Sequence, residues 1–358
     1  MSSSPYAAAL GRFKAVATHL LPKESYGPLL AAKDLAEIAK LLEPTAYGSE
    51  LAGASAQYQG VELLEVAVNR LFVRRNRMAL DAAPFAGKAV VAAYLRRWDV
   101  QNIGLILSSK AQNRLMTAVE TFLISSRDIP AGLIGGAMTL DDFRQLLAQP
   151  TLEAISAALV RFGYGAPLLP LLDGYQRSHD IFPLLQALDR DYYARLLEAI
   201  RHFQGDEWVV RQFVQSEIDL KNALLVLKGK DAALPLDEVL ARYLDGGQFT
   251  RNQAADAYTA RGLPEIVPVL EARFPHLSEG LARYDESRSL VGFETVLARE
   301  RALRELKRLR TYPLSLAILF ASMLVAELER TDLRRIVYAK VYGIPSASVE
   351  PTLIVPRL

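Results

Sequence analysis

The sequence predicts an all-α protein built from three related helical units. Two observations support this fold class. Apolar residues recur at helical spacing along most of the chain, and one short motif occurs three times, 120 and then 113 residues apart. No segment shows the sustained apolar and polar alternation of strands joined by hairpin turns. Of the 358 residues, 51% are hydrophobic and 23% charged, which provides enough apolar material for a sizeable core.

Helical spacing is clearest in residues 61–77, where an apolar face lies opposite a basic one. The basic face comprises Arg70, Arg74 and Arg77. Similar spacing predicts helices over residues 34–42, 139–147, 152–162, 192–203, 241–244 and 290–309. The longest uncharged apolar stretch, residues 314–326, is too short to cross a membrane and predicts a buried helix with Pro313 near its start. The N-terminus has no adequate apolar region for a signal peptide.

A six-residue motif marks the same point in each unit. Its copies are residues 98–103 (WDVQNI), 218–223 (IDLKNA) and 331–336 (TDLRRI). The second position is always aspartate, and the fifth is asparagine or arginine. These residues are Asp99, Asp219 and Asp332, with Asn102, Asn222 and Arg335.

Two further landmarks recur at constant offsets. Two glycine pairs, residues 135–136 and 246–247, each precede a threonine and lie 111 residues apart. Two Tyr-Gly pairs, at residues 47–48 and 164–165, lie 117 residues apart. Because independent positions share these offsets, we infer internal repetition. We place the three units at residues 1–149, 150–261 and 262–358.

The repeated aspartate follows one apolar helical segment and precedes another. Because Asp accepts hydrogen bonds from the free N–H groups of a first helical turn, we expect Asp99, Asp219 and Asp332 to cap a helix at the same junction in each unit. The alternative is a ring of three carboxylates around a metal or substrate, which would need a cation to offset their repulsion. Nothing in the sequence requires the three to converge.

The composition excludes several kinds of chemistry. The chain has no cysteine, so thiolate nucleophiles and cysteine-ligated metals are excluded, and its four histidines lack metal-ligand spacing. The glycine pairs lack the rest of a P-loop or dinucleotide fingerprint, so we expect loops after which Thr139 and Thr250 begin helices. The chain has 42 Lys plus Arg and 40 Asp plus Glu, so its composition does not indicate the excess of positive charge that is typical of nucleic-acid binding. We expect no catalytic residue, cofactor, metal or small-molecule substrate.

Three segments resemble a known family. Residues 20–26 (LLPKESY), continued by the Tyr-Gly pair at 47–48, resemble the opening of the C subunit of the V/A-type rotary ATPases, the relative of the eukaryotic V-ATPase d subunit. Residues 94–103 (YLRRWDVQNI) look like the family's first repeat motif. Residues 313–316 (PLSL) and 327–340 look like its last. Two positions depart from the repeat pattern: Gly104, where the second copy has Leu224, and Arg335, where the other copies have asparagine.

The resemblance implies three similar helical domains arranged around a pseudo-three-fold axis as a funnel. It also implies a non-catalytic rotor adaptor on the cytoplasmic side, peripheral to the membrane. The implied partners are the central shaft subunits and the proteolipid rotor ring, through which alone the protein would associate with the membrane. Torque passed between them would serve proton or sodium transport.

Arginine clusters are the candidate partner contacts, because a guanidinium can bind a carboxylate through two hydrogen bonds. They are Arg70, Arg74 and Arg77, Arg96 with Arg97, and Arg334 with Arg335. We expect a polar, charged shaft end and a more apolar ring end. A helical-repeat interaction scaffold and an enzyme with buried carboxylates are the alternatives. Units this long favour a closed assembly over a solenoid, whose repeats run to roughly 30–50 residues.

Overall fold

The predicted all-α class is confirmed. The computed structural model describes residues 6, 11, 20–114, 138–203 and 207–355, and in these residues every regular element is a helix. The largest elements form three hairpins, each with two long antiparallel arms. The hairpins are α5 (Gly60–Ala82) with α6 (Phe85–Leu95) and α7 (Arg97–Ala111), α12 (Phe182–Arg201) with α13 (Glu207–Asp231), and α18 (Val291–Arg310) with α19 (Ala317–Val341). In the first hairpin the second arm is broken into two helices, α6 and α7.

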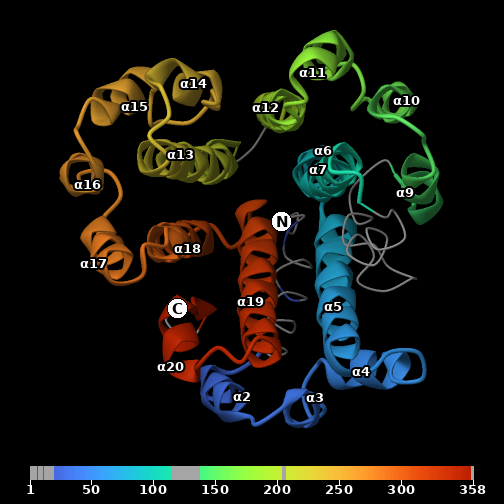
Figure 1. Ribbon diagram of the computed structural model, residues 1–358. Helices are drawn as coiled ribbons and strands as arrows, with labels where there is room; N and C mark the ends of the chain where they lie inside the picture. The colour runs from blue at the N-terminus through green and yellow to red at the C-terminus, as the bar shows by residue number, and fades with distance from the viewer. Residues whose placement is uncertain (1–5, 7–10, 12–19, 115–137, 204–206, 356–358) are drawn as a thin grey trace, which may run out of the picture.

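The hairpins pack against one another in a closed circuit (Figure 1). Helix α12 contacts α6 and α7, α13 contacts α18, and α19 packs along α5. Three aromatic rings, one from each hairpin, meet where the hairpins converge. The Phe320 ring centroid lies 5.0 Å from that of Tyr94 and 5.5 Å from that of Phe213. We call this central region the axis.

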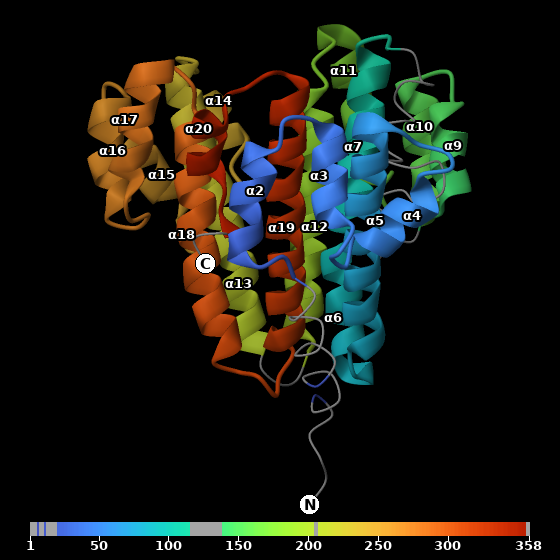
Figure 2. The ribbon, with the colours of Figure 1, turned by 90° about the horizontal axis from the view of Figure 1, so that it is seen from below.

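Short helices connect the hairpins and surround them at one end (Figures 1 and 2). They are η1 (Lys23–Ser25), α2 (Tyr26–Ala31), α3 (Leu35–Leu42) and α4 (Gly48–Ala54); α9 (Leu140–Leu147), α10 (Leu152–Ala158), η2 (Leu159–Phe162), η3 (Leu169–Leu171) and α11 (Leu172–Ser178); α14 (Leu236–Ala241), α15 (Arg251–Tyr258), α16 (Leu263–Glu271) and α17 (Leu277–Ser287); and α20 (Ser346–Val349) and η4 (Glu350–Thr352). Figure 2 shows that these helices gather toward one end, which we call the short-helix end. The opposite end, the turn end, comprises the described residues around the hairpin turns, 81–88, 198–203, 207–211 and 307–316.

Two local predictions are wrong, each for a visible reason. Of residues 241–244 only Ala241 is helical, as the last residue of α14, because the Asn222 side chain binds both the N–H and the carbonyl of Leu244 outside the helix. Pro313 is not in the apolar helix, because α19 begins only at Ala317, whose N–H donates to the Ser315 hydroxyl. The helix that follows is mostly buried, as predicted. In the part of the chain that the structure describes, no helix is long and apolar enough to cross a membrane.

Candidate functional site

None of the repeated aspartates caps a helix, so this expectation is wrong for all three copies. Asp219 and Asp332 are mid-helix in α13 and α19. Asp99 follows a helix break, but it is the third residue of α7, whose N-cap position is Arg96 and has no side-chain cap hydrogen bond. All three carboxylates are buried. A buried carboxylate needs hydrogen-bond donors, and in each unit they come from a distant segment.

Asp219 binds the glycine loop that follows its own hairpin. One carboxylate oxygen accepts from the N–H of Phe249 at 2.7 Å, and the other accepts from Arg273 at 2.7 Å. The loop passes so close that a Cβ on Gly247 would collide with the carboxylate. Thr250 then begins α15 with a capping box, and Thr139 begins α9 in the same way, as the sequence predicted. The other glycine pair, 135–136, lies outside the described residues.

Asp332 holds the end of the chain in a similar way. One oxygen accepts from the N–H groups of Ile354 and Val355, at 2.8 and 2.7 Å. Arg335, three residues on, donates to the other oxygen at 3.4 Å and also to the carbonyl of Thr352. Burial raises the pKa of Asp332 to about 6, although the two N–H groups and Arg335 act in the opposite direction. We call the contacts of Asp219 and Asp332 with these returning segments the clasps.

A second set of contacts links each unit to the previous one. The Tyr164 hydroxyl of the second unit donates to Asp99 of the first at 2.8 Å, and Arg273 of the third unit contacts Asp219 of the second. The Tyr47 hydroxyl of the first unit donates to Glu329 of α19 at 2.6 Å, which closes the circuit. A neighbouring unit thus donates to Asp99 and to Asp219, whereas Asp332 binds only segments of its own unit. Because each aspartate has separate partners, the three do not form a shared cation site.

Glu217 is the centre of an ion network at the axis. Its carboxylate lies 3.1 Å from Arg97 of the first hairpin and 3.1 Å from Arg301 of the third, and it accepts from the Tyr193 hydroxyl at 2.7 Å. Arg97 also reaches Glu327 of the third hairpin at 3.4 Å. Burial would raise the pKa of Glu217, but Arg97 and Arg301 outweigh it and lower the pKa to about 2. Arg97 therefore joins all three hairpins.

Glu329 is the centre of a second network between the first and third hairpins. Its side chain has no exposed surface, and it lies 2.6 Å from Arg75 of α5. It also accepts from the Tyr47 hydroxyl at 2.6 Å and from the N–H of Leu21 at 2.8 Å. Because one carboxylate receives three donors from two distant segments, it fixes both of them against α19.

The arginines predicted to contact partners lie in different environments. Arg97 is in the axial network, Arg334 pairs with Glu65 at 2.8 Å, and Arg335 belongs to the Asp332 clasp. Arg70 and Arg96 are half-buried. Arg74 and Arg77 are largely exposed, although they pair with Glu50 and Asp81 respectively. A partner-binding role remains a prediction for the whole set.

Sequence reasoning missed Arg75, Glu217, Glu327 and Glu329. A signal existed for Arg75, since it falls on the apolar face that includes Val68, Leu71 and Phe72. An arginine in an apolar stripe predicts a buried partner. Glu329 carried a similar signal, because it lies within the apolar helix α19 between Val325 and Leu333.

The two ends of the molecule differ in character. The turn end exposes one large apolar side chain per hairpin: Phe85 at 98%, Trp208 at 45% and Leu314 at 51%. Large apolar side chains are also exposed at the short-helix end, among them Val269 and Tyr342, so the difference between the ends lies in charge. The segments of the short-helix end are acidic in each unit. Residues 22–55 contain three Lys or Arg and five Asp or Glu, and residues 139–180 contain the same numbers. Residues 231–288 contain six Lys or Arg and ten Asp or Glu. Across the described residues, no group of three or more His, Cys, Asp or Glu could hold a metal ion.

Comparison with known proteins gives consistent matches along the chain. The family model described as ATP synthase (C/AC39) subunit matches residues 9–351. An A-type ATP synthase C subunit from Thermoplasma acidophilum is 34% identical over 351 residues, which cover 98% of both chains. The protein of that name from Thermoplasma volcanium is 33% identical over 98% of both chains. The one from Halorubrum lacusprofundi is 28% identical over 89% of both.

Proposed function

The chain belongs to the ATP synthase (C/AC39) subunit family, and from this premise we propose that it is the rotor adaptor of a V/A-type ATP synthase. In this role it is a non-catalytic subunit that links the central shaft to the membrane rotor ring and passes torque between them, in support of proton or sodium transport. It works on the cytoplasmic side, peripheral to the membrane.

The observation that carries the proposal is the axial network of Arg97 with Glu217 and Glu327. A coupling that transmits torque must resist twisting between its parts. Here one buried guanidinium ties three hairpins together, and the aromatic rings of Tyr94, Phe213 and Phe320 pack beside it. Buried charge pairs are costly to separate, because each partner would be left uncompensated. In the proposed adaptor, residues 1–149, 150–261 and 262–358 are three domains around a pseudo-three-fold axis, in the form of a funnel, and the presence of one hairpin in each range supports this division.

The ends suggest which partner binds where. An apolar patch on a folded surface is typical of a protein contact, so we assign the turn end, with Phe85, Trp208 and Leu314, to the rotor ring. We assign the acidic short-helix end to the shaft. Arg74 and Arg77 remain candidate contacts on the exposed face of α5.

Separate binding assays with purified ring and purified shaft test this proposal. The variant Phe85→Ser with Leu314→Ser changes two exposed side chains, so it should keep the helical content while it weakens ring binding and leaves shaft binding unchanged. The matched control is Val269→Ser with Val160→Ser, two apolar residues that are exposed on short helices. If wild-type protein bound neither ring nor shaft, the adaptor role would be wrong, and a general helical scaffold would be the better account.

A nucleotide assay tests the non-catalytic part of the proposal. The chain lacks the Gly-x-x-x-x-Gly-Lys-Ser/Thr loop whose N–H groups and lysine bind phosphates. Calorimetry of the isolated protein with Mg-ATP should therefore give no saturable heat. Micromolar binding would contradict the assignment.

A further inference from the structure

The turn end carries exposed cations beside its apolar side chains. Lys88, Arg211, Lys307 and Arg310 are all exposed. None of the four forms an ion pair within the described part of the chain, whereas Asp81 and Glu198 at the same end are paired with Arg77 and Arg201. The turn end contains six Lys or Arg against three Asp or Glu, so its charge is net positive, although the whole chain is only +2.

The turns that carry these apolar side chains contact one another. The Trp208 ring lies 5.1 Å from the Tyr312 ring, edge to face, so the turns of the second and third hairpins touch. Gly87 next to Phe85 lies against Leu316, which joins the turns of the first and third hairpins. Figure 2 shows all three turns at the end away from the short helices. We call Phe85, Trp208, Leu314 and the four cations the turn-end patch.

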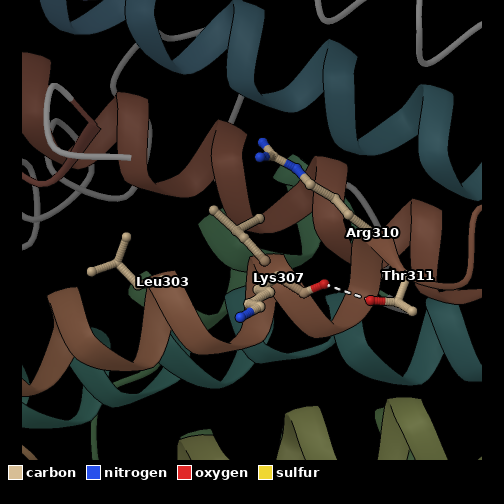
Figure 3. A pocket seen from close by; sticks show the side chains of 5 residues that line it. Leu303, Lys307, Arg310 and Thr311 are labelled. Carbon is tan, nitrogen blue, oxygen red and sulfur yellow. Dashed lines mark hydrogen bonds between the residues drawn. The ribbon is translucent and has the colours of Figure 1, made fainter.

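The pocket at the end of α18 shows how these cations are presented (Figure 3). It has a volume of about 560 Å³ and is lined by Leu303, Leu306, Lys307, Arg310 and Thr311. In Figure 3 the Lys307 and Arg310 side chains point away from each other, and the Thr311 hydroxyl donates to the Lys307 carbonyl at 2.9 Å. The pocket therefore does not enclose a single small anion. Cations spread over an apolar surface suit an extended array of negative charges instead.

We propose that the turn-end patch binds the anionic headgroups of a lipid surface. Aromatic side chains are enriched where proteins meet the membrane–water interface, since their rings are apolar and their edges polar. Lys and Arg near an anionic leaflet add electrostatic attraction. The acidic segments at the opposite end would be repelled by the same surface, so the charge asymmetry also orients the molecule. The inference rests on the proposed function for this orientation, because the ring is assigned to the same end. Ring protein and headgroups would share the patch in the assembled complex, whereas in the absence of ring protein the whole patch is open to lipid.

The test is binding of the full chain to lipid vesicles that contain no ring protein. One vesicle type is phosphatidylcholine alone, and the other is an equal mixture of phosphatidylcholine and phosphatidylglycerol. The wild type should sediment with the mixed vesicles and not with phosphatidylcholine alone. Each cation near an anionic surface contributes about fivefold in affinity, so the variant with Lys88, Arg211, Lys307 and Arg310 all changed to Gln should lose binding to the mixed vesicles.

A matched variant separates the patch from net charge. Lys23, Lys33, Lys40 and Arg177 are also exposed and form no ion pair with a described residue, but they lie on short-helix segments. Changing these four to Gln lowers the net charge by the same amount and should leave vesicle binding unchanged. An equal loss in both variants, equal binding to both vesicle types, or no binding of the wild type would each overturn the proposal.

Tryptophan fluorescence locates the contact. The chain has two tryptophans, and Trp98 is only 4% exposed while Trp208 is in the patch. Mixed vesicles with brominated acyl chains should quench wild-type emission and should not quench that of Trp208→Phe. Equal quenching of both, or none, would contradict contact through this patch. Binding to a detergent-purified ring in the absence of vesicles reports on the adaptor role alone, so failure of the lipid proposal and failure of the adaptor role are distinguishable.

Discussion

Glu217 at the axis and Asp332 at the chain end are both buried carboxylates on the second long helix of a hairpin, yet their pKa values move in opposite directions. Glu217 faces two guanidinium groups, each at 3.1 Å, and its pKa falls to about 2. Asp332 faces two backbone N–H groups and a more distant arginine, and burial raises its pKa to about 6.

The difference shows that two kinds of contact hold the molecule together. At the axis, full charges from different hairpins meet, and each depends on the others to remain ionised in a buried place. At the Asp332 clasp, the carboxylate mainly accepts hydrogen bonds from backbone N–H groups of a returning segment of its own unit. We expect the axial contacts to require charge and the Asp332 clasp to function without it.

Glu329 should give the largest effect, because it receives three donors and its side chain has no exposed surface. Glu329→Gln leaves Arg75 without a counter-charge, so we expect a loss of about 3–5 kcal/mol in the free energy of unfolding, measured by urea denaturation. The control is Asp81→Asn, which removes the partner of Arg77, an exposed arginine on the same helix. That change should cost less than about 1 kcal/mol, as for other surface ion pairs. Equal losses would show that burial does not distinguish the two arginines.

Glu217 should make the protein acid-sensitive at the axis. Its folded pKa lies below the unfolded value of 4.5, so its contribution is present above pH 4.5 and is lost as the pH falls toward 2. A shift of this size corresponds to about 3 kcal/mol. Urea denaturation of Glu217→Gln across this range should show a wild-type advantage at pH 5 that shrinks steadily on acidification. A pH-independent difference would contradict the charge-based account of the axis.

Asp332 should behave in the opposite sense. Its folded pKa of about 6 lies above the unfolded value of 3.8, so its contribution is fully present below pH 3.8 and is lost as the pH rises through 6. Asp332→Asn keeps an oxygen for the N–H groups of Ile354 and Val355 and removes the titration. Relative to this variant, the wild type should lose about 2–3 kcal/mol of stability between pH 4 and pH 7. A wild-type protein that instead gained stability over that range would show that the Asp332 clasp needs its charge.

Gly247 tests the fit of the Asp219 clasp. A Cβ at this position would force the Asp219 carboxylate or the loop to move, so Gly247→Ala should cost about 1–3 kcal/mol. Gly174→Ala is the matched control, because no neighbouring atom lies within 4 Å of its added Cβ, and alanine favours the helix by up to about 1 kcal/mol. Thermal denaturation of both variants measures the difference. A Gly247→Ala protein as stable as the wild type would mean that the loop has room to adjust.

The sequence was sufficient for the fold class because that depends on local periodicity. The apolar faces of α5 and α18 and the threonine caps of α9 and α15 are each encoded within a few residues. The repeat offsets singled out Asp99, Asp219 and Asp332, and all three are buried.

The roles of these residues were not predictable in the same way, because their partners are far away in the chain. Asp332 resembled a helix cap in sequence, but its donors are residues 354 and 355, and those of Asp219 are residues 249 and 273. Arg97 looked like half of a surface cluster, yet its partners lie 120 and 230 residues away. Such contacts depend on how the hairpins pack, and one sequence does not reveal that.

Native-state hydrogen exchange tests most directly whether the axial contacts make the three hairpins one body. The central amides of α7, α13 and α19 should exchange through one common opening with the same free energy, and that value should fall together in all three helices in Arg97→Met. If each hairpin opened with its own free energy, or if Arg97→Met changed only α7, the three would be separate domains. A rigid axial coupling would then be contradicted.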